Sequence, residues 1–167
     1  MNTIEWLSAQ RPGFGQLDPY EKTALVDFML MWTYFEATAL KCDASHDRIR
    51  RFSKNLAGEK KLDETKLEGP LRYFSERYFQ EGKPTFHFQF LRLMPKPSAL
   101  VEGVLSGKQK LPEERLTAAL HIAYRFRNNL FHGPKWEYDI RDQRGNFECA
   151  TEVLRASIEM MQDNLTY

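Results

Sequence analysis

The chain has 167 residues, of which 42% are hydrophobic and 28% charged, and its formal net charge is +1. This length fits one domain with its own hydrophobic core, and the composition is that of a globular protein rather than a disordered chain. No run approaches the roughly 18 apolar residues that a membrane-spanning helix needs, and a nearly neutral chain is not a polycation. The N-terminal sequence MNTIEWLSAQRPGFG does not resemble a signal peptide, so we expect a cytoplasmic protein without a membrane partner.

We expect residues 1–17 to be an N-terminal extension and residues 18–167 to form one helical bundle. A long helix is predicted from Pro19 to Lys41, because Asp18 suits the N-cap and a proline suits the first turn. Glu36 interrupts the apolar stripe of this helix, so its carboxylate needs a partner or water. The stripe consists of Leu25, Phe28, Met29, Trp32, Phe35, Ala39 and Leu40.

A basic helix is predicted in SHDRIRRFSKNLAGE, residues 45–59. Between Lys41 and Lys61, seven basic residues outnumber three acidic ones. One interpretation is an ordinary solvated helix face, and the other is a phosphate-facing patch in which Arg48 and Arg51 contact nucleic acid. The inward side chains of this helix would be Ile49, Phe52 and Leu56.

Shorter elements are predicted in the middle of the chain. Residues 64–82 carry apolar side chains at helical spacing, and Pro70 means that this helix starts or bends there. In residues 83–96 three phenylalanines alternate as they would in a strand, but a single strand has no partner, so an irregular segment or short helix is expected. A short helix should follow Pro97.

The second long helix is predicted in residues 111–133, where Gly133 and Pro134 stop it. Its inward stripe is Leu116, Leu120, Ala123 and Leu130, with Arg127 among them. A polar loop should cover residues 137–146, and a final helix residues 147–165. Two long core helices with shorter ones predict an all-α bundle.

The cysteines and the histidine near them give no metal signal. Cys42 and Cys149 lie far apart in the sequence, and we expect two free, buried thiols in a reducing compartment. His46 and Asp47 stand close to Cys42, but their spacing fits no common metal site. We therefore expect neither a metal nor another cofactor.

The strongest candidate for chemistry is RNNLFHG, residues 127–133. Arginine offers fixed donors to phosphate oxygens, and histidine exchanges protons near neutral pH. Arg127 and His132 would converge if the last helical turn loosens at Gly133, and Asn128 adds a neutral donor. The plain alternative is an ordinary helix end, where arginine and histidine are favoured by the helix dipole. Spacing alone favours that alternative, because chance alone gives about one such pair in this composition.

The stretch RNNLFHGPK resembles the signature of the HEPN superfamily, in which an arginine and a polar residue precede a histidine near a helix end. FMLMWTYFEATAL is similar to the early helix of that family, which often carries an inward acidic residue, here Glu36. The resemblance spans residues 18–167, although only these two stretches are specific. Pro134 departs from one branch of the family, which has a tyrosine at that position.

The resemblance implies a HEPN-like helical bundle, a homodimer with a shared cleft, and a metal-independent endoribonuclease of toxin or antiviral-defence type. Arg127, His132 and Asn128 would be catalytic, Glu36 and Lys135 supporting, and Arg125 and Lys135 would contact RNA. The resemblance also implies that such an endoribonuclease has a cognate antitoxin or a defence-system partner. Two alternatives stay open: a non-catalytic module that binds RNA or nucleotides, and a helical dimerisation protein in which Arg127 and Glu36 form a structural ion pair.

Overall fold

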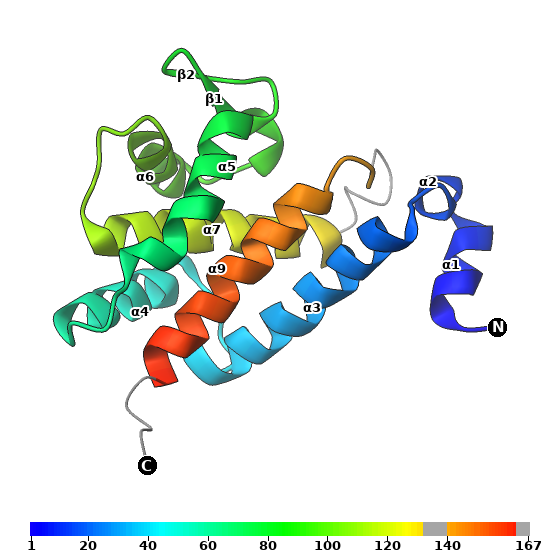
Figure 1. The fold of residues 1–167 in the computed structure, drawn as a ribbon, viewed down its shortest axis with the longest axis horizontal. Coiled ribbons are helices and arrows are strands. Elements are labelled where there is room, and N and C mark those ends of the chain that lie inside the picture. Colours follow the sequence, from blue (N-terminus) through cyan, green and yellow to red (C-terminus); the bar gives the residue numbers. More distant parts are fainter. Residues whose placement is uncertain (132–139, 163–167) are drawn as a thin grey trace.

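A computed structural model describes residues 1–131 and 140–162, and in these ranges the fold is all-α, as predicted (Figure 1). The long helices are α3 (Pro19–Ala39), α7 (Pro112–Phe131) and α9 (Arg144–Gln162). α3 and α9 lie side by side and make the most extensive contact between two of the described elements. α7 passes behind them in this view. Within the described ranges no helix combines the length and apolar character needed to cross a bilayer.

α3 forms where the sequence predicted it. The Glu21 amide donates to Asp18 Oδ1 at 2.8 Å, and the Asp18 amide donates to Glu21 Oε2 at 2.9 Å, which completes a capping box. The helix ends at Ala39, two residues earlier than predicted. Lys41 and Cys42 have φ of 55° and 57°, and this left-handed backbone cannot continue a helix.

Three shorter helices surround α7. α4 (His46–Gly58) packs on it, and Ser45 caps α4 by accepting a hydrogen bond from the Arg48 amide. α5 (Glu68–Tyr78) follows the 3₁₀ helix η1 (Glu64–Leu67), and Pro70 lies in its first turn, so the proline marks a start rather than a bend. α6 (Pro95–Leu105) packs against α7 and begins two residues before the predicted Pro97.

Residues 83–96 are largely irregular, as expected, but they begin with the second strand of a small hairpin. The two-residue strands β1 (Phe79–Gln80) and β2 (Lys83–Pro84) pair antiparallel, and Gly82 supports their turn with φ of 74°. The alternating phenylalanines belong to no strand: two of them lie in the 3₁₀ helix η2 (Phe88–Leu91). The strand-like alternation was therefore misleading, and the short-helix expectation is confirmed.

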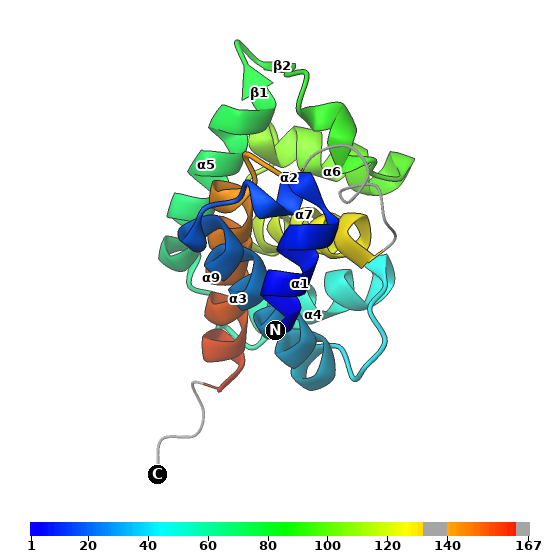
Figure 2. The same cartoon turned by 90° about the vertical axis from the view of Figure 1, so that its right-hand side faces the viewer.

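The N-terminal residues form α1 (Thr3–Gln10) and α2 (Pro12–Gly15), which the sequence did not predict. α1 buries no residue fully, although Leu7 is partly buried against the core. Phe14 and Leu17, in contrast, are buried in the main core. Figure 2 shows α1 and α2 beside the start of α3. The bundle thus reaches back to Phe14 within the predicted extension of residues 1–17.

Phe28 marks the place where the three long helices meet. Its ring lies 6.4 Å from that of Phe126 in α7 and 5.3 Å from that of Phe147 in α9. The three side chains are at most 3% exposed. Burying each contributes about 1.5–3 kcal/mol. This aromatic junction fixes the C-terminal half of α7 against α3.

Two expectations about single segments were wrong in part. Arg144 to Asn146 belong to α9 rather than to a polar loop, and Ile140 is buried, while residues 137–139 lie outside the described ranges. Both cysteines are free, but Cys42 is exposed rather than buried. Burial raises the pKa of the half-buried Cys149 to about 12, so its thiol stays protonated.

Candidate functional site

The structure brings Arg127 of α7 and Glu36 of α3 together, as the sequence suggested. Arg127 Nη2 lies 3.7 Å from Glu36 Oε2, and the side chains are 26% and 21% exposed. The separation is within ion-pair range but longer than a hydrogen bond. The pair therefore couples the two helices by charge, while the guanidinium keeps contact with solvent.

Glu36 reaches this place because it shares the stripe of α3 with Phe28 and Trp32, at intervals of four residues. Trp32 Nε1 donates to the same Oε2 atom at 2.7 Å, and the Trp32 ring stacks on Tyr124 of α7 at 5.7 Å. Trp32 is only 1% exposed. The carboxylate is thus held by a buried indole, and the arginine approaches an oxygen that is already engaged.

Arg127 has two further neighbours near the end of α7. Its Nη1 donates to Asn128 Oδ1 at 3.0 Å, and its guanidinium lies 5.1 Å from the ring centre of Phe131. Phe131 is 54% exposed. Arg127 Nε is buried and meets no acceptor among the described residues. This arginine is therefore positioned by a carboxylate, an amide and an aromatic ring, with guanidinium donors left for an anion.

His132 and Lys135 lie outside the described residues, as do Gly133 and Pro134. The approach of His132 to Arg127 stays a prediction. The described part of α7 ends at Phe131, directly before the histidine.

Arg125, predicted to contact nucleic acid, has contacts within the chain, and its contact with RNA stays a prediction. Its Nε donates to the Leu91 carbonyl at 2.7 Å, and its Nη2 lies 3.4 Å from Asn129 Oδ1. Asn129 Nδ2 in turn donates to the Phe90 carbonyl at 3.2 Å. Burial lowers the pKa of Arg125 from its ordinary value. These bonds fasten η2 to α7.

Arg48 and Arg51 lie on α4. Arg48 Nε forms an ion pair with Asp43 at 2.7 Å, and Arg51 Nε donates to the Asp47 carbonyl at 3.4 Å. Arg51 is exposed to solvent. Contacts between described residues do not link either arginine to Arg127. Their geometry fits the solvated-face interpretation of the basic helix.

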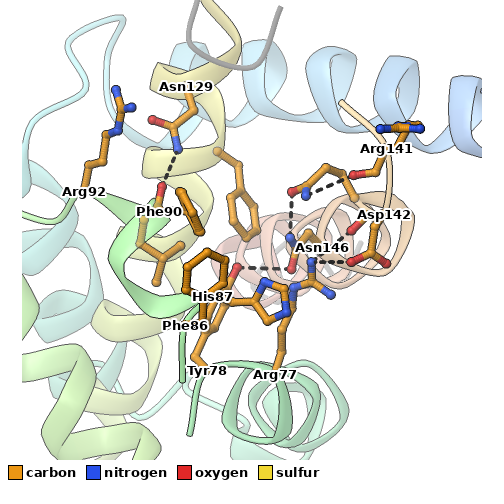
Figure 3. A pocket seen from close by; sticks show the side chains of 13 residues that line it. Arg77, Tyr78, Phe86, His87, Phe90, Arg92, Asn129, Arg141, Asp142 and Asn146 are labelled. Carbon is orange, nitrogen blue, oxygen red and sulfur yellow. Dashed lines mark hydrogen bonds and ion pairs between the residues drawn. The ribbon is translucent and has the colours of Figure 1, made fainter. Parts of the chain in front are cut away.

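The sequence did not indicate a pocket of about 330 Å³ on another side of α7 (Figure 3). Its walls come from the end of α5, from η2, from α7 and from residues 141–146. Phe86 and Phe90, whose alternation resembled a strand, lie at this pocket and are 70% and 46% exposed. The sequence shows these two phenylalanines but not their exposure, so it gave no signal of the pocket.

No model of a known protein family matches this chain, and no curated protein or solved structure matches it either. The described residues contain no group of three side chains that could hold a metal ion. The interpretation of the site thus depends on its own geometry and on the sequence resemblance.

Proposed function

We propose that this protein is a HEPN-like endoribonuclease that cleaves RNA without a metal ion, of the toxin or antiviral-defence type. The observation that carries the proposal is the partly exposed Arg127, held near Glu36 at the end of α7 immediately before His132. A structural ion pair would be expected to form close hydrogen bonds, whereas this pair is separated by 3.7 Å.

In the proposed reaction a base removes the proton of the ribose 2′-hydroxyl, and the 2′-oxygen attacks the adjacent phosphorus. The bond from phosphorus to the 5′-oxygen breaks, and that oxygen receives a proton. The products carry a 2′,3′-cyclic phosphate and a 5′-hydroxyl. Arg127 would bind the phosphate oxygens and stabilise their charge, and His132 would transfer protons. Asn128 would support the phosphate or orient the histidine through the part of its amide that Arg127 does not use.

The proposal includes a homodimer, in which two copies of the Arg127–His132 pair share one cleft. The exposed face of α3 supports it. Val26, Leu30 and Tyr34 recur at intervals of four residues and are 37%, 67% and 48% exposed. Thr33 belongs to the same exposed face and is the i−3 neighbour of Glu36. An interface on this face would therefore run close to the Arg127 site.

The test is RNA cleavage in the presence of EDTA by the wild type, Arg127→Ala and His132→Ala. Arg155→Ala is a matched control, because Arg155 is an exposed arginine of α9. We expect wild-type and control cleavage, and a loss of about 10²–10⁴-fold in the His132 variant. Equal cleavage by His132→Ala would overturn the mechanism. If the wild type and all variants bind RNA but none cleaves it, the non-catalytic module is favoured. If only Arg127→Ala unfolds, the structural ion pair is favoured.

A further inference from the structure

The pocket of Figure 3 lies on a different side of α7 from Arg127. Phe126 and Asn129 line the pocket, whereas Arg127 turns toward Glu36 on α3. Successive residues of a helix are separated by about 100°, so Arg127 is 100° from Phe126 and about 160° from Asn129. With a volume of about 330 Å³, the pocket is at the small end of the range for ligand sites. It is therefore a second site, separate from the proposed cleavage site.

One wall of the pocket presents aromatic rings to solvent. The Phe86 and Phe90 rings lie 4.9 Å apart in an edge-to-face arrangement, with 70% and 46% of these residues exposed. Phe126, only 3% exposed, also lines the pocket. Covering these exposed phenylalanine rings with a flat, unsaturated ring is favourable, because it removes apolar surface from water. The added ring can stack on one phenylalanine and contact the edge of the other.

The rim of the pocket is cationic. Arg77, Arg92 and Arg141 line it against one acidic residue, Asp142, and that carboxylate is paired with Arg77 at 3.0 Å. Arg92 is exposed and follows η2 with φ of 50°, a left-handed conformation that is unfavourable for a residue other than glycine. The bond from Arg125 to the Leu91 carbonyl holds the backbone just before it. The fold thus places Arg92 at the edge of the pocket at some conformational cost.

Neutral amides complete the opposite wall. Asn146 is 2% exposed: its Oδ1 accepts from the Tyr78 hydroxyl at 3.2 Å, and its Nδ2 donates to Gln143 Oε1 at 2.8 Å. Gln143 Nε2 reaches the Arg141 carbonyl at 3.3 Å. The amide of Gln143 still has one proton and one lone pair to offer. An apolar aromatic wall, a polar amide edge and a cationic rim suit a ligand that joins an aromatic heterocycle to an anion.

We propose that this pocket binds a nucleotide, with its base against Phe86 and Phe90 and its phosphate at Arg92. A shallower hollow shares Arg77, Phe86 and His87 with the pocket and continues past Lys83 of the hairpin. A sugar–phosphate chain could follow this hollow. The nucleotide can therefore be a free mononucleotide or an unpaired residue of a single strand, and both offer the same base and phosphate. The inference does not depend on the cleavage reaction.

The experiment is isothermal titration calorimetry with the four ribonucleoside monophosphates and with a short single-stranded 2′-O-methyl oligonucleotide, which cannot be cleaved through a 2′-hydroxyl. We expect binding that Phe86→Ala and Arg92→Gln each weaken by roughly fivefold or more. Both residues are exposed, so circular dichroism should show native folds. Arg155→Gln, the matched control, should bind like the wild type.

Each outcome has a defined meaning. Binding of monophosphates identifies a free nucleotide as the ligand, and binding of the oligonucleotide alone identifies a single strand. The proposal is overturned if neither probe binds, or if Phe86→Ala and Arg92→Gln bind as tightly as the wild type. Nucleotide binding by a protein that cleaves no RNA would leave this inference intact and refute only the proposed function.

Discussion

At the scale of single residues, one carboxylate oxygen connects the site to the core. Glu36 Oε2 accepts from Trp32 Nε1 at 2.7 Å and lies 3.7 Å from Arg127 Nη2. The indole is buried and the guanidinium is partly exposed. The role of Glu36 in folding can therefore be separated from its role beside Arg127, because the tryptophan needs only an acceptor whereas the arginine responds to charge.

Two substitutions of Glu36 should differ in stability. Glu36→Gln keeps an acceptor for Trp32, so we expect a loss of at most about 1 kcal/mol in the free energy of unfolding. Glu36→Ala leaves the buried indole N–H without its acceptor, and we expect a loss of about 1–3 kcal/mol. Urea denaturation measures both. Equal losses in the two variants would show that the hydrogen bond to Trp32 does not anchor the carboxylate.

His121 should make stability depend on pH. Burial, and secondarily the neighbouring His46, lowers the pKa of His121 to about 4 from an ordinary 6.5. Between these values the folded state keeps the imidazole neutral while the unfolded chain takes up a proton. The free energy of unfolding therefore falls as pH decreases from 6.5 to about 4, by at most roughly 1.4 kcal/mol per pH unit.

His121→Leu tests this prediction, because it removes the titrating ring from the buried position. Denaturation at several pH values should show a smaller slope between pH 6.5 and 4 in this variant than in the wild type. His87→Leu is the matched control, since it removes an exposed histidine instead of a buried one. An unchanged slope in His121→Leu would mean that this histidine is protonated in the folded state.

At the scale of elements, the attachment of η2 to α7 decides the shape of the second pocket. Arg125 and Asn129, one turn apart on α7, bond the carbonyls of Leu91 and Phe90. Arg125 was predicted to contact RNA because a sequence shows its charge and not its partners. With its guanidinium engaged by a backbone carbonyl, this residue orders the segment that carries Phe90 and Arg92.

Removing this attachment should loosen η2 locally. In Arg125→Met the side-chain stem is kept but the donors are lost, so we expect amide hydrogen exchange of Phe88, Phe90 and Arg92 to accelerate about tenfold, which corresponds to about 1.4 kcal/mol. Amides in the centre of α7 should exchange as in the wild type. Arg155→Met serves as the control. Unchanged exchange in η2 would show that other contacts hold it.

At the scale of the whole molecule, the long helices could be predicted from local sequence signals, whereas the second pocket depends on contacts between distant segments. α3 was predictable because Asp18 and Pro19 start it and an apolar stripe continues it, both of which are local signals. α1 also has a local start signal, the capping box of Asn2 and Glu5, but none of its residues is buried. The second pocket is assembled from residues 77–92, 126–129 and 141–146, and no local pattern records that convergence. Glu36 and Arg127 were paired only because both interrupted apolar stripes.

The proposed dimer gives a prediction at the same scale. Sedimentation velocity should give a mass of twice the 19.7 kDa of one chain. Leu30→Lys places a charge in the middle of the exposed face of α3, and we expect it to shift the protein to a monomer and to reduce RNA cleavage. Lys108→Glu, away from this face, should stay dimeric. A monomeric wild type at the concentrations that support cleavage would exclude a shared cleft.

We propose that Arg127 and His132 cleave RNA through its own 2′-hydroxyl. The most direct measurement incubates the wild-type protein, in EDTA, with an RNA strand and with the 2′-O-methyl strand of the same sequence, and determines the ends of all fragments by mass spectrometry. We expect that only the RNA is cut, and that its fragments carry 2′,3′-cyclic phosphates and 5′-hydroxyls. Cleavage of the methylated strand, or fragments with 3′-hydroxyl and 5′-phosphate ends, would contradict it.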